Sequence, residues 1–193
     1  MTSNINFKGK FISPVIIKKL DIQKKYIPHQ ASIIQIDTAN EKDIIALKNA
    51  SKNWDTSSPT LSFSDIIYED AKGIYEMGED NNFHKFFVLT NQKKDFAELN
   101  QDEILAMTEI SDYPNSKKIG IEALEVHPDH NYWSENRNYK QIGSGLLDAI
   151  KQIFKGKEIN LRSVDSALAF YYKNEFIPIT RNSHDLQYLN FDI

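Results

Sequence analysis

The sequence contains no cysteine, so disulfide bonds and cysteine-based chemistry are both excluded. Its N-terminus has no apolar stretch of the kind that marks a secretory signal, and no apolar run in the chain is long enough to span a membrane. Internal repeats and low-complexity tracts are also missing. A chain that needs no oxidising compartment and shows no export signal is expected in the cytoplasm.

Positive charge is scarce as well. The 23 Lys and Arg residues are outnumbered by 27 Asp and Glu residues, which leaves a formal net charge of −4. Because nucleic-acid-binding proteins usually carry a basic face, this balance argues against DNA or RNA as a general partner. An acidic protein body instead suits a cationic amine as substrate, through long-range attraction. The abundance of Ile, Asn and Lys suggests an AT-rich genome, bacterial or phage-borne.

Enough apolar residues are present for one core. The 193 residues are 40% hydrophobic, which fits a single domain with a substantial interior. In the first half, residues 33–36 and 86–89 have the pattern of apolar strands. Between them, the run from Thr38 to Glu41 fits a capping box that opens a helix at Thr38. A second helix is expected to open at Ser62 or Ser64.

Only seven glycines occur in the chain, and two of them stand in one turn. Gly143 and Gly145 close the run that begins at Lys140, and Leu146 then starts an apolar pattern of helical period. Because glycine has no Cβ, the first backbone N–H groups of this helix stay approachable, at the positive end of the helix dipole. Such a helix start binds phosphate or pyrophosphate. Ordinary capping and close packing explain the same glycines equally well.

The strand ahead of this turn changes phase. Ile119, Ile121 and Ala123 are apolar at odd positions, whereas Leu124 and Val126 are apolar at even positions. Because strand side chains alternate with a period of two, the switch predicts an extra residue, that is, a β-bulge near Ala123 and Leu124. A bulge leaves backbone groups open to a ligand. A strand buried on both faces is the alternative interpretation.

After the turn, the apolar alternation of residues 158–164 predicts a strand, and a short helix is expected over 166–174. Together these segments resemble the acetyl-CoA motifs of the GCN5-related N-acetyltransferase (GNAT) superfamily. The resembling segments run from Leu124 to Pro128, from Lys140 to Gly145 and from Ala167 to Phe176. The likeness is close over residues 84–178 and concerns element order alone over 33–83.

This resemblance implies an α/β (α+β) fold with a mixed twisted sheet of about six to seven strands and about four flanking helices. The GNAT-like domain is expected over 33–193. Residues 1–32 precede it as an extension that adds a strand or hairpin, and a homodimer through this edge is left open. The sequence departs from the motif at Lys140, where Arg or Gln is usual. It departs again at Glu175, which replaces a glycine, so the turn before Phe176 is expected to differ.

Acetyl-CoA is the cofactor that the resemblance implies. The thioester arm is assigned to the backbone of Leu124, Glu125 and Val126, and Lys173 is a further cofactor contact. The pyrophosphate is assigned to Lys140, Gln141, Ile142, Gly143, Ser144 and Gly145. Tyr171 is the implied general acid, since a phenol is protonated at neutral pH. A core aromatic at helical spacing is the alternative for Tyr171, and Tyr172 is the alternative donor.

The general base is less clearly indicated. If the bulge is present, Glu122 and Glu125 both face away from their apolar neighbours. Two carboxylates on one face can attract an ammonium group and take its proton, directly or through water. No metal is expected, because His29, His84 and His184 share no ligand spacing with the pair His127 and His130.

The leading hypothesis is therefore an acyltransferase, an acetyl-CoA-dependent N-acetyltransferase that acts on a primary amine of a small molecule or peptide. Two alternatives stay open. One is a non-catalytic acyl-CoA-binding regulatory module that has lost its acid or base. The other is a toxin-type acetyltransferase acting on aminoacyl-tRNA, against which the acidic composition argues. The fold cannot name the acceptor, because function depends on the site.

Overall fold

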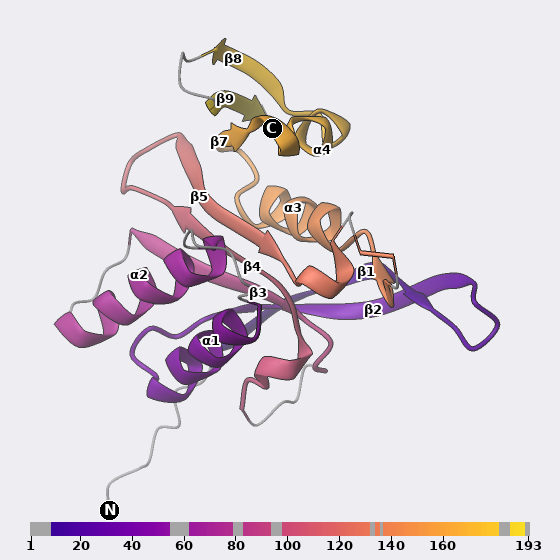
Figure 1. Cartoon of the computed structure of the whole chain (residues 1–193). Coiled ribbons are helices and arrows are strands. Elements are labelled where there is room, and N and C mark those ends of the chain that lie inside the picture. Colours follow the sequence, from indigo (N-terminus) through magenta and orange to yellow (C-terminus); the bar gives the residue numbers. More distant parts are fainter. Residues whose placement is uncertain are drawn as a thin grey trace, which may run out of the picture.

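A computed structural model describes residues 9–54, 62–78, 83–93, 98–131, 134–135, 137–181 and 186–191. These residues form a mixed sheet of nine strands, which is covered by helices on both faces (Figure 1). The predicted fold class is confirmed, but the expected count of six to seven strands is too low. None of the described helices is long and apolar enough to cross a membrane.

The order of elements along the chain is simple. The strands are β1 (Lys10–Leu20), β2 (Tyr26–Gln35), β3 (His84–Thr90), β4 (Ile104–Ser111), β5 (Lys118–Val126), β6 (Tyr139–Lys140), β7 (Glu158–Val164), β8 (Ile177–Arg181) and β9 (Leu186–Phe191). The α-helices are α1 (Glu41–Trp54), α2 (Phe63–Met77), α3 (Ile142–Ile153) and α4 (Leu168–Lys173), and short 3-10 turns occupy Gln101–Glu103, Pro128–His130 and Asp165–Ala167. In space the strand order is β6-β1-β2-β3-β4-β5-β7-β9-β8.

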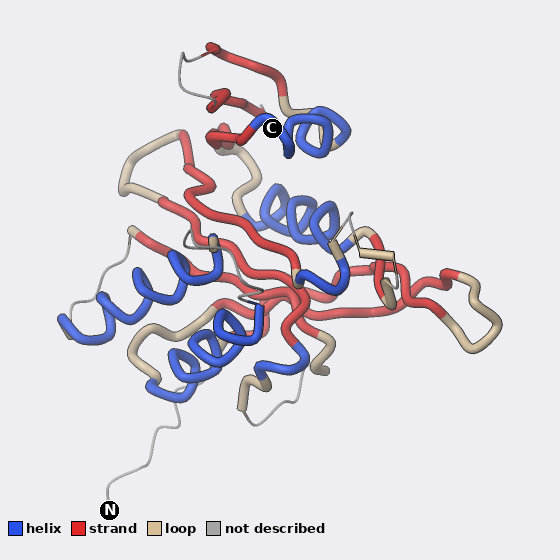
Figure 2. Tube along the Cα trace, in the orientation of Figure 1, coloured by secondary structure: helices blue, strands red, loops and turns tan. Residues whose placement is uncertain are grey.

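The N-terminal region extends the sheet at one edge. β1 and β2 form a long antiparallel hairpin, which Figure 2 shows extending away from the helices. The short strand β6 then pairs with β1 through Lys140 and Tyr139. The expected division at residues 32 and 33 falls inside β2, so the hairpin and the remainder share one sheet. A functional division at this point stays a prediction.

The sheet separates two apolar clusters. Buried side chains of α3 and the strands fill one face, with Leu146 and Ile150 fully buried. Buried side chains of α1 and α2, among them Leu47 and Ile67, fill the other face. Each helix thus buries one apolar stripe against the same sheet, which is the arrangement expected for a layered α/β fold.

The predicted bulge is confirmed in β5. Ala123 pairs with Glu109 of β4, whereas Ile121 pairs with the next residue, Ile110, so Glu122 is the extra residue. Ile121 packs in the α3-face cluster, and Ala123 packs in the cluster under α1 and α2. The bulge therefore explains the switch in apolar phase, and it lies one residue ahead of the predicted position.

The helix starts agree with the sequence in one case and differ in the other. Ser62 caps α2 in a reciprocal capping box with Asp65, as one of the two expected alternatives. The expected box at Thr38 is wrong, because α1 begins at Glu41 and the Asn40 side chain accepts the N–H of Lys42. Asparagine is as good an N-cap as threonine or better, so the later start has its own capping residue.

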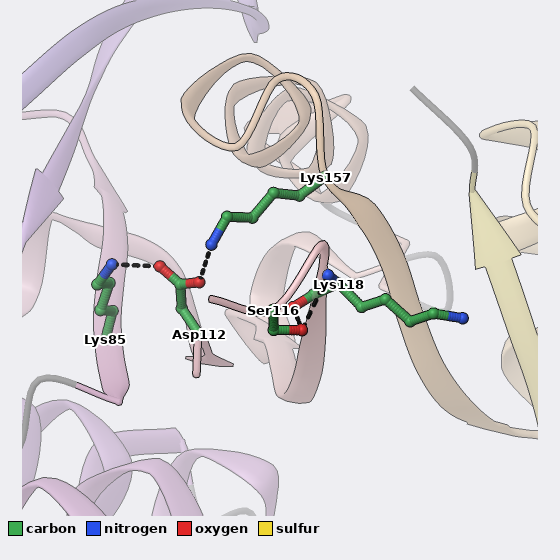
Figure 3. A network of polar contacts seen from close by, with 5 residues as sticks. All are labelled: Lys85, Asp112, Ser116, Lys118 and Lys157. Atoms are coloured by element: carbon green, nitrogen blue, oxygen red, sulfur yellow. Dashed lines mark hydrogen bonds and ion pairs between the residues drawn. The ribbon is translucent and has the colours of Figure 1, made fainter. Parts of the chain in front are cut away.

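The loop between β4 and β5 is fixed by charge. Figure 3 shows Lys85 of β3 and Lys157, which follows α3, both reaching Asp112 from different sides. Although partial burial acts to raise it, the hydrogen bonds from both lysines hold the pKa of Asp112 below its ordinary value. In the same view Ser116 bonds the backbone of Lys118, where β5 begins. These contacts hold together the end of the sheet at which β5 and β7 pair.

Candidate active site

The first element of the candidate site is a fork in the sheet, the place where the neighbouring strands β5 and β7 stop pairing. β5 and β7 run parallel and pair from Lys118 opposite Glu158 to Ile121 opposite Leu161. Beyond the bulge at Glu122, β5 continues to pair with β4 but no longer with β7. The β7-facing backbone groups of the last residues of β5 thus have no strand partner within the described sheet. Such groups require a hydrogen-bonding partner, which a ligand arm can supply.

The start of α3 is the second element. Gln141 caps the helix in the left-handed conformation, with φ of 62° and ψ of 22°. The first intrahelical bond runs from the Gly145 N–H to the Gln141 carbonyl oxygen, at 2.9 Å. The N–H groups ahead of Gly145 have no partner inside the helix, and they lie at its positive end. This geometry suits an anionic group such as a pyrophosphate.

Both glycines of the turn are also needed for packing. A Cβ at Gly143 would lie 3.0 Å from Cζ of Phe170 and 3.4 Å from a methyl carbon of Val126. At Gly145 a Cβ would come within 2.9 Å of Val15 on β1. Close packing, which the sequence left open, is therefore real at both positions. At Gly143 it brings the end of β5, the start of α3 and the helix α4 into contact.

Tyr171 lies in α4 beside that meeting point. Its side chain is only 8% exposed, and its ring contacts the rings of Phe170 and Phe176 with centroids 5.0 Å and 5.7 Å away. Burial raises the pKa of the Tyr171 phenol to about 12. The group therefore keeps its proton at neutral pH and can donate it. Tyr172, the alternative donor, is 44% exposed.

The two predicted carboxylates share the α1/α2 face of the sheet, but their surroundings differ. Glu122 is exposed and accepts a hydrogen bond from the Ser111 hydroxyl at 2.5 Å. Glu125 is half-buried and accepts the backbone N–H of Ser64, in the first turn of α2. Burial raises the pKa of Glu125, while the hydrogen bond from Ser64 acts to lower it. Glu125 thus holds a helix end, and Glu122 is the more accessible of the two.

A shallow groove of about 290 Å³ lies elsewhere, between β1 and α3. Its lining includes Val15, Ile16, Gly145 and Asp148. Of the predicted site residues it contains Gly145 alone, so it is distinct from the fork.

The fold of this chain recurs in solved acetyltransferases. A Desulfovibrio desulfuricans protein assigned to the GNAT acetyltransferase family matches it with a TM-score of 0.57 and 11% identity, over 83% of this chain and 98% of that chain. The Thermoplasma acidophilum PaiA N-acetyltransferase, in complex with coenzyme A, matches with a TM-score of 0.57 and 15% identity, over 84% of this chain and 99% of that chain. The Campylobacter jejuni N-acetyltransferase PseH, in complex with acetyl-CoA, matches with a TM-score of 0.51 and 16% identity, over 83% of this chain and 98% of that chain. The chain has the GNAT fold.

Sequence comparison gives no such match. Neither a protein-family model nor a curated protein matches the sequence. The likeness is therefore one of structure, and it rests on the strands and helices rather than on shared residues.

The departures from the GNAT motif turn out to be local. Glu175 adopts a φ of 70°, the left-handed conformation that glycine favours. Phe176, which follows, is buried in the core, and a difference between this turn and the usual one stays a prediction. Lys140 places its ammonium 3.9 Å from the ring centroid of Tyr26 on β2. Lys173 is exposed at the end of α4.

A group of rings beside the candidate site was not predicted from the sequence. His127, directly after β5, lies against Trp54 of α1 and stacks on His130 with centroids 5.1 Å apart. His130 in turn contacts Tyr139 of β6. Burial lowers the pKa of both histidines. Their i,i+3 spacing around Pro128 was the one sequence signal, and no group of described residues could hold a metal ion.

Proposed function

We propose that this protein is an acetyl-CoA-dependent N-acetyltransferase that acts on a primary amine. The observation that carries the proposal is the meeting of Val126, Gly143 and Phe170, which joins the open end of the fork to the α3 start and to the helix of Tyr171. Support comes from the GNAT fold and from two structural neighbours that hold coenzyme A or acetyl-CoA. Bound acetyl-CoA would supply an activated acetyl group, whose C–S bond breaks as a C–N bond forms.

The chain would contact acetyl-CoA mainly through backbone groups. Residues 141–145 present the N–H groups of the α3 start to the pyrophosphate, with Lys140 and Lys173 as flanking cations. Leu124, Glu125 and Val126 present their unpaired strand edge to the pantetheine arm, as an extra strand would. The side chains of Leu124 and Val126 pack against the α3-face cluster, so this wall of the fork is apolar.

Tyr171 supplies the proton for the departing thiolate. It lies on α4 next to Phe170, which touches the fork through Val126 and Gly143. With its pKa raised to about 12 by burial, the phenol holds the proton until a strong base forms beside it. The CoA thiolate that forms at this position would be such a base.

Glu122 prepares the amine. Its carboxylate lies at the bulge, where the fork opens, and faces the side opposite the cofactor wall. There it can attract an ammonium group and take one proton, which leaves the uncharged nitrogen that nucleophilic attack requires. Glu125 is the second choice for this role, because its carboxylate is already engaged by the first turn of α2.

Two measurements on the intact protein test the proposal. Isothermal titration with acetyl-CoA should give saturable binding. A thiol-release assay with acetyl-CoA and a panel of amines (diamines, amino sugars and peptide N-termini) should give turnover with at least one class. Binding without turnover would favour the regulatory-module alternative, and absence of binding would contradict both.

A further inference from the structure

The β1–β2 hairpin is a cationic element of an otherwise acidic protein. Between Lys10 and Gln35, Asp21 is the single acidic residue, and it stands against five lysines, which are Lys10, Lys18, Lys19, Lys24 and Lys25. None of these five forms an ion pair with another of the residues that the structure describes. Lysines of the body, meaning the described residues after Gln35, do so, as Lys118 and Lys157 show. The positive charge of the hairpin is therefore not neutralised within the described molecule.

The end of the hairpin projects from the body. Leu20 and Tyr26 anchor the two strands through hydrogen bonds to the backbone oxygens of residues 137 and 138. Residues 21–25, here called the tip, lie beyond these anchors, and their hydrogen bonds within the described chain join them to one another. The carboxylate of Asp21 accepts two backbone N–H groups inside the tip, at 2.8 Å each. Asp21 thus shapes the turn, and the tip remains an uncovered, protruding element (Figure 2).

An apolar side chain stands at the extremity. Ile22 is 100% exposed, and Ile16 and Ile27, on the two strands behind it, are 63% and 46% exposed. Aliphatic side chains flanked by lysines suit the boundary between lipid headgroups and acyl chains, where the aliphatic part inserts and the ammonium groups stay at the surface. Nucleic-acid contacts favour arginine and aromatic rings instead, and residues 18–25 hold neither.

The register of the sheet adds a second sign of an anionic partner. Lys18 of β1 lies directly opposite Lys140 of β6. Like charges that face each other across two strands destabilise a sheet. The ammonium of Lys140 is held on the hairpin, 3.9 Å from the ring centroid of Tyr26. An anionic surface against the hairpin would offset the repulsion between these two lysines.

The acidic body does not cancel this attraction. Ile17 is fully buried, and the three residues that follow it on β1 are not. At about 3.3 Å per residue, these place the start of the tip about 10 Å beyond the core. The Debye length at physiological ionic strength is about 8 Å, so a surface that meets the tip is largely screened from the carboxylates of the body.

We propose that the hairpin tip docks this protein on a membrane surface that contains anionic lipids. Ile22 enters the boundary between headgroups and acyl chains, and the lysines of the hairpin attract the anionic headgroups. This contact needs no membrane-spanning segment. It uses neither the fork nor the α3 start, so it is independent of the proposed acetyltransferase function.

Cosedimentation of the full chain with lipid vesicles tests the docking. The protein should bind vesicles of phosphatidylcholine with about 30% phosphatidylserine and should not bind vesicles of phosphatidylcholine alone. Raising NaCl from about 0.1 M to about 0.5 M should release most of it. Lys24→Glu combined with Lys25→Glu should weaken binding about thirtyfold or more. Ile22→Ser, which leaves the charge unchanged, should weaken it about tenfold. These side chains are exposed, so thermal unfolding should match the wild-type protein.

Matched variants in the body separate the tip from net charge and from general apolar exposure. Lys52→Glu combined with Lys155→Glu makes the same change of charge at two exposed positions, and Ile45→Ser removes an isoleucine that is 46% exposed on α1. Both should bind anionic vesicles as the wild-type protein does. The docking is overturned if the wild-type protein does not bind anionic vesicles, if the tip variants bind equally well, or if the body variants lose as much binding. It is also overturned if the tip binds RNA in place of the vesicles. The assay contains no acetyl-CoA, so failure of the proposed enzymatic activity leaves its result unaffected.

Discussion

The two faces of β5 offer opposite chemistry within the same few residues. Toward α3, the strand presents Ile121, Leu124 and Val126, which pack in or against the apolar cluster. Toward α1 and α2, it presents Glu122 and Glu125. The bulge at Glu122 makes this possible, because it resets the alternation just where the fork opens. One face can hold a large anionic cofactor through backbone groups, and the other can handle protons and a cationic acceptor.

Under the proposed function, β5 would separate cofactor binding on one face from proton transfer on the other. If it is correct, substitutions on the α3 side should affect cofactor affinity and thiol departure. Substitutions on the α1/α2 side should affect amine deprotonation and leave cofactor affinity unchanged.

The largest effect is expected at Tyr171. Tyr171→Phe keeps the ring that packs on Phe176 and removes only the hydroxyl, so kcat should fall by about a hundredfold to ten-thousandfold. Affinity for acetyl-CoA should be unchanged by titration calorimetry. Tyr172→Phe is the control and should retain activity. Undiminished kcat in Tyr171→Phe would make Tyr171 a core aromatic only.

Substitutions of Glu122 and Glu125 should cause different defects, one in catalysis and the other in stability. Glu122→Gln should lower kcat by about a hundredfold at neutral pH, since an exposed group at the bulge loses its ability to take a proton. Glu125→Gln should mainly lower the free energy of unfolding, by about 1 kcal/mol, because the carboxylate serves the first turn of α2. Kinetics and urea unfolding of both variants check this, and the reverse pattern would exchange their roles.

The α3 start should be sensitive to any side chain at Gly143. Gly143→Val places carbon against Phe170 and Val126, so acetyl-CoA affinity should fall about tenfold or more, at a stability cost of about 1–3 kcal/mol. Gly73→Ala in α2 is the control, because a Cβ there meets nothing within 4 Å. Gly73→Ala should raise the free energy of unfolding by about 0.5–1 kcal/mol and leave the affinity for acetyl-CoA unchanged. A folded Gly143→Val protein with full affinity would contradict the assignment.

The buried carboxyl of Glu109 should make stability depend on pH. Its pKa is raised from 4.5 to about 7 by burial, so the folded state binds more protons than the unfolded state between these values. Its contribution is fully present below about pH 4.5 and is lost as the pH rises through about 7. Relative to the wild-type protein, Glu109→Gln should therefore gain about 1–3 kcal/mol in unfolding free energy between pH 5 and pH 8. Urea unfolding checks this, with the exposed Glu76→Gln as control.

The smallest effect is expected at Glu175. A side chain in the left-handed conformation is strained, and Glu175 is exposed, so Glu175→Gly should raise the unfolding free energy by about 0.5–1 kcal/mol. Thermal unfolding at one pH measures the change. Activity should be unaffected, and a destabilised variant would mean that the Glu175 side chain contributes more than its strain costs.

Local patterns predicted much of the fold, including the start of α3 and the bulge in β5 that frame the candidate cofactor site. The glycines before Leu146, the phase switch around Ala123 and the Ser62 cap all report on residues close together in the chain. Alternation and helix capping depend on such short spacings, so they can be read directly. The start of α1 was misplaced because Thr38 and Asn40 are both good capping residues and pattern alone does not choose between them.

The contacts between strands on the α1/α2 face could not be predicted, because they depend on register between distant strands. Nothing in the sequence places His84 opposite Ser111, or Glu109 beside His84, until β3 and β4 are paired. The edge-on contact between the rings of His127 and Trp54 likewise joins the end of β5 to the end of α1. The left-handed conformation of Glu175, directly before the buried Phe176, is likewise not readable from the residue type, because side chains other than glycine seldom adopt it.

Amide chemical shifts on addition of acetyl-CoA test the central claim most directly. In a two-dimensional NMR titration, saturable shifts should concentrate at residues 141–145 and 124–126, on the α3 side of the fork. The amides of His84 and Glu109, on the opposite face, should move little. Shifts concentrated instead at Val15 and Asp148 in the groove beside β1, or no saturable shift at all, would contradict the division of β5 into a cofactor face and a proton-handling face.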